Sequence, residues 1–506
     1  MISKVRTVAF IGMRPIEIIV EAQITPGISS FCIVGLPDKA VGEAKERIRA
    51  AFFQLGIGFP SGKVVINMAP ADIPKAGSHY DLPIALAIFG AMDVIDIMAI
   101  DNSISIGELG LDGTLPYISG TICAAMLANE KNLSLICPKK CENEALWSGN
   151  NSIIATPSII SLINHLNGTA QISTSISTNG KYVDPDFEID MSDVYGQIYA
   201  KRAIEIATTG RHNMLMIGPP GSGKSMLASR IKTILPMLSP SEALETTCIY
   251  SLAGMLPKEG LIYHPPYRDP HNSASLISMV GGGSEAKPGE ISLAHNGVLF
   301  LDELPEFQRT VIESLRQPLE TNEITISRAK EHITYPANIQ LIAAMNPCKC
   351  GYFGSKDKQC LKAPKCAIEY RNKISGPILD RFDIVIHVNN VKASELFENA
   401  NNETSKTIRE RVEIVRDLQK QRAQKYDVTS SYYNGKAQGK YLEVITKLDS
   451  DTKSAFQKTI EYSNISARSC YKILRVARTI ADMENEEFIL KRHISEAIQY
   501  QFLKQI

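Results

Sequence analysis

An octapeptide near the middle of the chain has the residue types and spacing that bind phosphate. It consists of Gly218, Pro219, Pro220, Gly221, Ser222, Gly223, Lys224 and Ser225, and it matches the G-x-x-x-x-G-K-S/T phosphate loop at every fixed position. Backbone N–H groups of such a loop face the phosphates, with the positive end of the following helix behind them. We expect Lys224 to reach the β- and γ-phosphates and the Ser225 hydroxyl to bind Mg²⁺. The sequence therefore predicts ATP and Mg²⁺ as cofactors.

Elements that would position this loop flank it on both sides. Residues 213–217 are apolar and predict a buried strand, and residues 226–235 favour a helix that stops at Pro236. The alternative is a chance glycine turn ahead of a helix. A strand, the complete motif and a helix in this order favour nucleotide binding.

Two carboxylates follow a second apolar stretch, residues 297–301. A buried parallel strand would bring Asp302 to the Mg²⁺ at its carboxyl end. Glu303 would then orient and polarise the attacking water. The alternative is a solvated acidic turn after a core strand.

Three more residues complete the predicted ATPase site. Asn346 ends the apolar stretch 339–345, and we expect it to contact the γ-phosphate or the attacking water. Arg381 would project toward the γ-phosphate of a neighbouring subunit, although a surface salt-bridge cluster with the aspartates around it is the alternative. Arg468 opens a C-terminal helix and would report the nucleotide state to the lid. Competing candidates on the same helix are Arg475 and Arg478.

Together these motifs resemble those of the magnesium-chelatase-like AAA+ proteins of the ComM/YifB group. The resemblance covers nearly the whole chain and is carried by residues 31–38, 67–75, 281–306, 346–351, 375–383 and 475–482. It implies a homo-hexameric ring ATPase that moves on single-stranded or branched DNA, with a helicase or branch-migration role in recombination or natural transformation. It also implies the roles given above to the residues of the nucleotide site.

The N-terminal part of the chain resembles the Lon-protease fold, whose catalysis needs a serine nucleophile and a lysine base. The nucleophile position falls on His79, with Ser78 one place early, and the segment matching the base contains no lysine. We therefore expect a non-catalytic domain that forms the ring or faces DNA. In a further departure, the family often shows a His-His pair where this chain has His271 and Asn272, which weakens any role assigned to that pair.

The predicted fold class is α/β with an all-helical end. We expect a Lon-protease-like α/β domain over residues 1–168, a Ser/Thr/Asn-rich linker over 169–190, an AAA+ core with a parallel sheet over 191–390, and a helical lid over 391–506. Predicted strands of the first domain span 16–22, 30–34, 63–68, 104–107 and 133–137, and its helices span 41–55, 81–92 and 121–128. Further helices are predicted over 196–207, 403–424, 439–463 and 466–482.

Composition limits the possible surroundings and partners. The 54 basic and 54 acidic residues give a formal net charge of zero, so DNA binding needs a local patch. The longest apolar run, 82–92, is too short to cross a bilayer, and the first residues lack the apolar core of a signal peptide. We expect a cytoplasmic protein in a reducing compartment, without a membrane-spanning segment.

Four basic residues are candidates for DNA contacts. Arg328 and Lys330 lie at the tip of a predicted β-hairpin, strands 323–327 and 332–335, where they would hold phosphates in the channel of a ring. A solvated hairpin tip is the alternative. The sequence between Lys224 and Asp302 is long for this fold, and we interpret residues 263–288 as an inserted loop. That loop carries the other two candidates, Arg268 and Lys287.

Four cysteines cluster after Asn346: Cys348, Cys350, Cys360 and Cys366. Four thiolates suffice for a tetrahedral Zn²⁺ site. Their spacing differs from paired C-x₂-C knuckles, so unligated structural cysteines remain the alternative.

Three functions remain open from the sequence. An ATP-driven DNA motor is the leading hypothesis. The others are a metal-chelatase-type AAA+ motor subunit and a protein-remodelling AAA+ ATPase.

Overall fold

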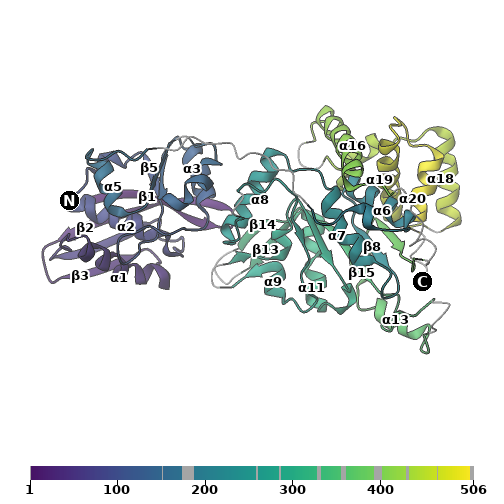
Figure 1. Ribbon diagram of the computed structural model, residues 1–506, viewed down its shortest axis with the longest axis horizontal. Coiled ribbons are helices and arrows are strands. Elements are labelled where there is room, and N and C mark those ends of the chain that lie inside the picture. The colour runs from purple at the N-terminus through teal and green to yellow at the C-terminus, as the bar shows by residue number, and fades with distance from the viewer. Residues whose placement is uncertain are drawn as a thin grey trace.

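The computed structural model describes residues 2–150, 152–173, 187–257, 260–283, 286–327, 332–354, 360–391, 402–428, 432–463 and 465–501. The molecule is elongated (Figure 1): an N-terminal α/β unit lies at one end, a parallel sheet with its helices in the middle, and a helical unit at the other end. The predicted fold class is thus confirmed. In the described part of the chain, no helix has the length and apolar character needed to cross a membrane.

The N-terminal unit is built on a seven-stranded mixed sheet in the order β3-β4-β2-β1-β5-β6-β7. Antiparallel pairing joins β1 to β2 and β2 to β4, and the other pairs are parallel. The strands are β1 (Ile2–Ile11), β2 (Arg14–Thr25), β3 (Ser30–Val34), β4 (Lys63–Ala69), β5 (Ser103–Ser105), β6 (Ser134–Pro138) and β7 (Ile153–Thr156). The helices are α1 (Lys39–Gln54), α2 (Asp81–Ala91), α3 (Thr121–Glu130), α4 (Glu142–Leu146) and α5 (Ile159–Leu166). Residues 81–90 of α2 are all buried, as its uninterrupted apolar sequence predicts.

A five-stranded parallel sheet in the order β16-β8-β15-β12-β9 forms the centre of the molecule. Its strands are β8 (Met214–Ile217), β9 (Tyr267–Arg268), β12 (Val298–Leu301), β15 (Gln340–Met345) and β16 (Ile384–His387). The flanking helices are α6 (Ile198–Gly210), α7 (Lys224–Ile234), α8 (Pro240–Leu252), α9 (Leu276–Val280), α10 (Glu290–Leu293), α11 (Arg309–Ser314), α12 (Arg316–Thr321), α13 (Lys365–Arg371) and α14 (Gly376–Leu379). Because helices cover both faces, the strands are nearly continuous apolar runs.

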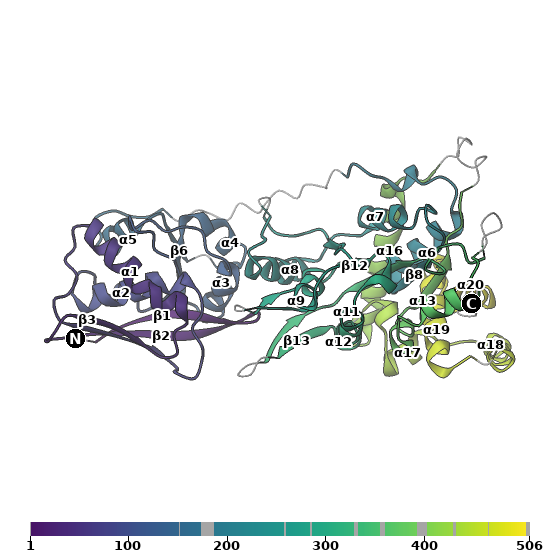
Figure 2. The ribbon, with the colours of Figure 1, turned by 90° about the horizontal axis from the view of Figure 1, so that it is seen from below.

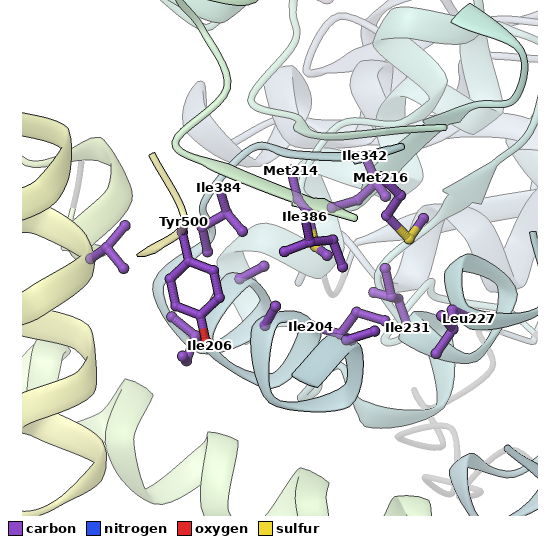
Figure 3. Close-up of a cluster of buried hydrophobic side chains, with 14 of the residues drawn as sticks. Ile204, Ile206, Met214, Met216, Leu227, Ile231, Ile342, Ile384, Ile386 and Tyr500 are labelled. Atoms are coloured by element: carbon purple, nitrogen blue, oxygen red, sulfur yellow. The ribbon is translucent and has the colours of Figure 1, made fainter. Parts of the chain in front are cut away.

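One face of this sheet packs on α6 and α7 (Figure 3). Ile204 and Ile206 of α6 and Ile231 of α7 lie against Met214 and Ile386 of the strands, and all five side chains are buried. This packing fixes α7, the helix that follows the phosphate loop, against β8, the strand that precedes the loop.

The interpretation of residues 263–288 as an inserted loop is wrong in part. They contain β9, which pairs in parallel with β12 and forms one edge of the central sheet. They also contain α9 and the short ribbon of β10 (Gly281–Gly282) with β11, Lys287–Pro288. A strand of two residues carries no periodicity that a sequence pattern can detect.

The predicted hairpin between the carboxylates and Asn346 is confirmed. β13 (Glu323–Ser327) and β14 (His332–Pro336) pair antiparallel. Its tip, with Arg328 and Lys330, lies outside the described residues, so DNA contact by these side chains stays a prediction.

Figure 2 shows how the N-terminal unit reaches this hairpin: the β1–β2 ribbon extends from its own sheet toward β13 and β14. At the turn of that ribbon, a Cβ added to Gly12 would lie 3.0 Å from the carbonyl oxygen of Thr334. A second contact joins α3 to α8, where the backbone N–H of Gly120 donates to Oγ of Ser251 at 2.8 Å. These contacts pack the N-terminal unit on the central one. The predicted linker, 169–190, lies mostly outside the described residues, which omit 174–186.

The C-terminal unit is helical, as predicted. It contains α16 (Ser405–Lys425), α17 (Gly439–Ile445), α18 (Ser450–Tyr462), α19 (Ala467–Met483) and α20 (Lys491–Gln499). The prediction of one helix over 439–463 is wrong, because Asp449 starts a new helix there. Its carboxylate accepts the backbone N–H of Thr452 at 2.6 Å, the contact of an N-cap residue.

Candidate nucleotide-binding site

The phosphate-loop octapeptide joins β8 to α7. Gly221 and Gly223 adopt left-handed φ angles of 78° and 88°, which a residue with a Cβ rarely adopts. Gly218 is confined in another way, since an added Cβ would lie 2.2 Å from the carbonyl oxygen of Val388. The loop can therefore turn tightly at the edge of the sheet and leave its N–H groups at the start of α7.

Lys224 lies inside this loop. Its Nζ donates to the carbonyl oxygens of Gly218 and Pro219, both at 2.8 Å. Burial lowers the pKa of Lys224, although the carboxylates of Asp302 and Glu303 act in the opposite direction. An amine held by neutral groups at the start of a helix fits an anionic phosphate.

Four predicted residues meet at the carboxyl ends of β8, β12 and β15. Oγ of Ser225 donates to Oδ2 of Asp302 at 2.6 Å. Nζ of Lys224 lies 3.3 Å from Oδ1 of Asn346. A hydroxyl and a carboxylate that touch form the oxygen donor set that Mg²⁺ prefers, so the residues present fit the predicted ion.

Glu303 has a partner that the sequence did not reveal. Its backbone is left-handed, with φ of 51°, and its Oε2 accepts from Nδ2 of Asn272 at 3.2 Å. Asn272 follows β9, which lies beside β12, and this neighbourhood places its amide at the carboxylate. The sequence showed Asn272 only as a departure from a His-His pair, and β9 was too short to be recognised.

A cavity of about 440 Å³ opens beside the loop and was also missed. Gln197 fixes its rim, since Nε2 donates to the carbonyl oxygen of Ser222 at 3.3 Å and to that of Asn389 at 2.5 Å. Such a partly apolar recess next to a phosphate loop suits the base and ribose of a nucleotide. Its lining includes Val194, Tyr195, Gln197, Met226, Leu227 and Val391.

Arg381 and Arg468 lie away from this cluster. Arg381 directly precedes the segment that enters β16, whereas the phosphate loop leaves β8, and the two strands are parallel. The arginine therefore lies at the amino ends of the strands, whereas the phosphate loop lies at their carboxyl ends. There Arg381 forms an ion pair with Glu320. Arg468 is close by, with Nη1 4.0 Å from Oδ2 of Asp380. Both arginines therefore lie apart from the phosphate loop of the same chain.

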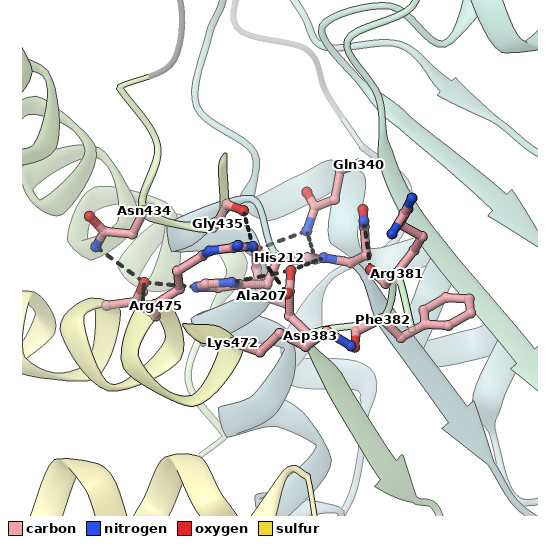
Figure 4. Close-up of polar contacts among 12 residues, drawn as sticks. Ala207, His212, Gln340, Arg381, Phe382, Asp383, Asn434, Gly435, Lys472 and Arg475 are labelled. Carbon is pink, nitrogen blue, oxygen red and sulfur yellow. Dashed lines mark hydrogen bonds and ion pairs between the residues drawn. The ribbon is translucent and has the colours of Figure 1, made fainter. Parts of the chain in front are cut away.

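Hydrogen bonds from two elements fix the backbone that carries Arg381 (Figure 4). Nδ2 of Asn213 donates to the carbonyl oxygen of Arg381 at 3.0 Å, and Nζ of Lys472, on α19, donates to that of Phe382 at 3.0 Å. The position of the arginine is thus set jointly by the central sheet and the C-terminal unit.

Asp383 is the buried anion of this network. Its carboxylate lies 3.6 Å from Nδ1 of His212 and 3.8 Å from Nη1 of Arg475. Burial alone would raise the pKa of Asp383, but the adjacent imidazole of His212 and the charges of Arg475 and Lys472 outweigh it and hold the pKa below its usual value. Asp383 therefore neutralises the cations that connect α19 to the arginine-bearing loop.

Comparisons with known proteins identify the family to which the chain belongs. A family model of the magnesium chelatase subunit ChlI matches residues 190–396, a second model of subunit ChlI of Mg-chelatase matches 20–141, and a model of the ChlI C-terminal part matches 402–501. The chain is 38% identical over 505 residues to the competence protein ComM of Haemophilus influenzae, which spans 97% of this chain and 96% of that protein. It is 39% identical over 507 residues to YifB of Escherichia coli, spanning 100% of this chain and 98% of that one. The chain belongs to the ComM/YifB family. Membership in this magnesium-chelatase-like AAA+ family indicates an ATPase that uses ATP and Mg²⁺.

Ser78 and His79, the residues at the protease-like nucleophile position, have partners within the N-terminal unit, and so does the nearby Lys75. Oγ of Ser78 donates to Glu108, Nζ of Lys75 donates to the carbonyl oxygen of Pro70, and Nε2 of His79 lies 2.9 Å from the carbonyl oxygen of Val8. That this unit has no protease activity stays a prediction.

Of the candidate DNA contacts that are described, Arg268 is paired within the chain. Its Nε and Nη2 lie 2.6 and 2.7 Å from the two carboxylate oxygens of Glu290. This bidentate pair ties β9 to α10, and DNA contact by Arg268 would have to replace it. Lys287, on β11, is exposed. Its contact with DNA stays a prediction.

The four cysteines after Asn346 come together. The sulfur atoms of four residues all lie within 4.8 Å of one another: Cys348, Cys350, Cys360 and Cys366. The closest pair recorded is Cys348 and Cys350, with their Sγ atoms 3.2 Å apart. The arrangement could hold one metal ion with four sulfur ligands.

Proposed function

We propose that this protein is a homo-hexameric ring motor that hydrolyses ATP to move on single-stranded or branched DNA, in a helicase or branch-migration role in recombination or natural transformation. The observation that carries the proposal is that the two parts of the predicted ATPase site lie at opposite ends of the strands of one sheet. The phosphate loop lies at the carboxyl ends, and Arg381 with Arg468 lies at the amino ends. Chains joined head to tail would complete each site with the neighbour's arginines, and a closed series of such contacts is a ring.

The residues at the carboxyl ends of the strands have separable tasks in hydrolysis. Lys224 would bind the terminal phosphates, and Glu303, held by Asn272, would orient the attacking water and accept its proton. Mg²⁺, held by Ser225 and Asp302, would neutralise charge on the phosphates. Arg381 from the next chain would stabilise the charge that develops in the transition state.

Two comparisons support DNA as the partner. The Haemophilus relative is named a competence protein. A DNA replication licensing factor, mcm6 of Dictyostelium discoideum, is 20% identical over 320 residues, which cover 60% of this chain and 32% of that protein. An ATP-driven DNA motor would act in the cytoplasm.

We also propose Zn²⁺ as the ion of the four-cysteine cluster, a linker over 169–190 between the N-terminal domain and the ATPase core, and a helical lid from 391 onward. A metal-chelatase-type motor subunit is a second candidate, since the model that matches residues 190–396 is that of a magnesium chelatase subunit.

The proposal is tested by steady-state ATP hydrolysis without DNA and with single-stranded DNA, duplex DNA or a four-way junction. We expect DNA to stimulate hydrolysis by the natural chain, and Glu303→Gln to abolish hydrolysis under every condition. Hydrolysis that is indifferent to all three DNAs would reject a DNA motor and favour the chelatase-type or protein-remodelling role.

A further inference from the structure

The described residues between Asn346 and α13 form no apolar core of their own. Among them, Cys348 and Gly351 are buried, whereas Leu361 is fully exposed and residues 361–365 all lie at the surface. Hydrophobic burial cannot offset the entropy of ordering such a loop. Its conformation needs another source of stability, and a metal ion or cross-link is the usual source in small units without a core.

The thiols of this segment lie close enough together to bind one zinc ion in common. A tetrahedral ion with Zn–S bonds of about 2.3 Å places its sulfur ligands about 3.8 Å apart. The four sulfur atoms lie within 4.8 Å of one another, and one pair is at 3.2 Å. Four thiolates around Zn²⁺ carry a net charge of about −2, and the neighbouring side chains of Lys349, Lys362 and Lys365 are basic and exposed.

This cluster adjoins the phosphate loop. Gly351 follows Cys350 with a left-handed φ of 81°, and a Cβ added to it would lie 2.5 Å from Cδ of Pro220. Its backbone N–H donates to the carbonyl oxygen of Cys348 at 2.9 Å. The residue that touches Pro220 is thus held between two of the cysteines.

A second connection runs along the chain. Cys348 lies two residues after Asn346, whose Oδ1 is 3.3 Å from Nζ of Lys224. A movement of the cysteine cluster would therefore shift both Pro220 of the phosphate loop and the amide that faces its lysine.

We propose that Zn²⁺ bound by Cys348, Cys350, Cys360 and Cys366 holds Gly351 against Pro220 and so fixes the phosphate loop in its nucleotide-binding conformation. The inference rests on the proposed ATP site but is independent of DNA. Loss of the ion would release the segment and weaken nucleotide binding before any step of hydrolysis.

The first test uses the purified full-length protein. Zinc is counted per chain, and the ion is then replaced by Co²⁺, whose visible spectrum reports tetrahedral thiolate ligands. We expect about one zinc ion per chain and a thiolate spectrum with cobalt. Cys360→Ser should lose both, whereas Cys32→Ser, which changes a thiol of the N-terminal sheet, should lose neither. A full-length protein that folds without metal, with four free thiols, would overturn the proposal.

The second test separates the contact with Pro220 from the metal itself. Gly351→Ala keeps all four thiols but adds a methyl group that clashes with the ring of Pro220. Gly354→Ala imposes a similar left-handed strain, with φ of 77°, and its added Cβ meets no atom of the described chain within 4 Å. We expect Gly351→Ala to retain zinc and to bind a non-hydrolysable ATP analogue about tenfold more weakly, a loss of ~1.4 kcal/mol. Gly354→Ala should bind the analogue like the natural chain.

Metal removal from the natural chain provides the same readout without a substitution. After the chelator has been dialysed away, affinity for the analogue should be reduced, and added Zn²⁺ should restore it. Equal affinity with and without zinc, or equal affinity of the two alanine variants, would overturn the link to the phosphate loop. If the natural zinc-bound chain failed to bind the analogue, the proposed ATP site would be at fault instead.

Discussion

Replacing Asp383 with asparagine should cost about 3 kcal/mol of the free energy of unfolding. The side chain keeps its volume, so no cavity forms, but the charge that faces His212, Arg475 and Lys472 disappears. Removing one partner of a buried ion pair costs about 3–5 kcal/mol. We take the lower end because the side chain of Arg475 is 21% exposed, although Asp383 itself is 4% exposed.

The effect should depend on pH in a defined direction. The pKa of Asp383 is lowered in the folded protein, so its contribution is complete above the unfolded value of about 3.9 and is lost as the pH falls through the folded pKa. The difference in unfolding free energy between the natural chain and Asp383→Asn should therefore be constant at neutral pH and shrink below about pH 4.

The same substitution should affect catalysis through Arg381. Without its anion, Lys472 is less well held, and its hydrogen bond to the carbonyl oxygen of Phe382 helps to fix the loop that carries Arg381. The phosphate loop is at the opposite ends of the strands, so affinity for ATP should be unchanged while the turnover rate falls.

The assay is urea unfolding followed by circular dichroism, together with ATP binding and hydrolysis. Asp380→Asn is the matched control, since its carboxylate is 48% exposed and lies 4.0 Å from Arg468. Exposed pairs contribute at most about 1 kcal/mol. The reasoning is refuted if both variants have the same stability, or if Asp383→Asn loses ATP binding along with turnover.

Two further predictions concern the residues around the attacking water. Asn272→Ala should lower the turnover rate about tenfold at unchanged affinity for ATP, because the carboxylate of Glu303 loses the amide that orients it. The control is His271→Ala, which changes an exposed neighbour and should leave the rate unchanged. Equal rates for the two variants would exclude this role of Asn272. Arg381→Ala chains mixed with Glu303→Gln chains should regain ATP hydrolysis that neither variant shows alone, because some interfaces then combine an intact Glu303 with an intact Arg381; a mixture as inactive as its components would contradict action between chains.

The central sheet, with the part of the site at its phosphate loop, could be predicted from the sequence. Four of its strands are buried on both faces, so each is a nearly continuous apolar run. The runs of β12 and β15 end at Asp302 and Asn346, and the run of β8 ends at the phosphate loop. In a parallel sheet these ends lie at one edge. For that reason the meeting of Lys224, Ser225, Asp302 and Asn346 followed from the sequence alone.

Other features depend on contacts that no local pattern records. β1 was missed because its outward side chains, Lys4 and Arg6, interrupt the apolar run. β9 has two residues, so neither the strand order nor the contact of Asn272 with Glu303 could be anticipated. The position of Arg468 is set by the packing of α19 against the residues before β16, which are distant in sequence.

The most direct test of a ring motor on DNA is the ATP-dependent displacement of a labelled strand from a four-way junction. The natural chain should release the strand only when ATP is hydrolysed, and Glu303→Gln should bind ATP without releasing it. A protein that hydrolyses ATP yet leaves the junction intact under all conditions would contradict the proposed function.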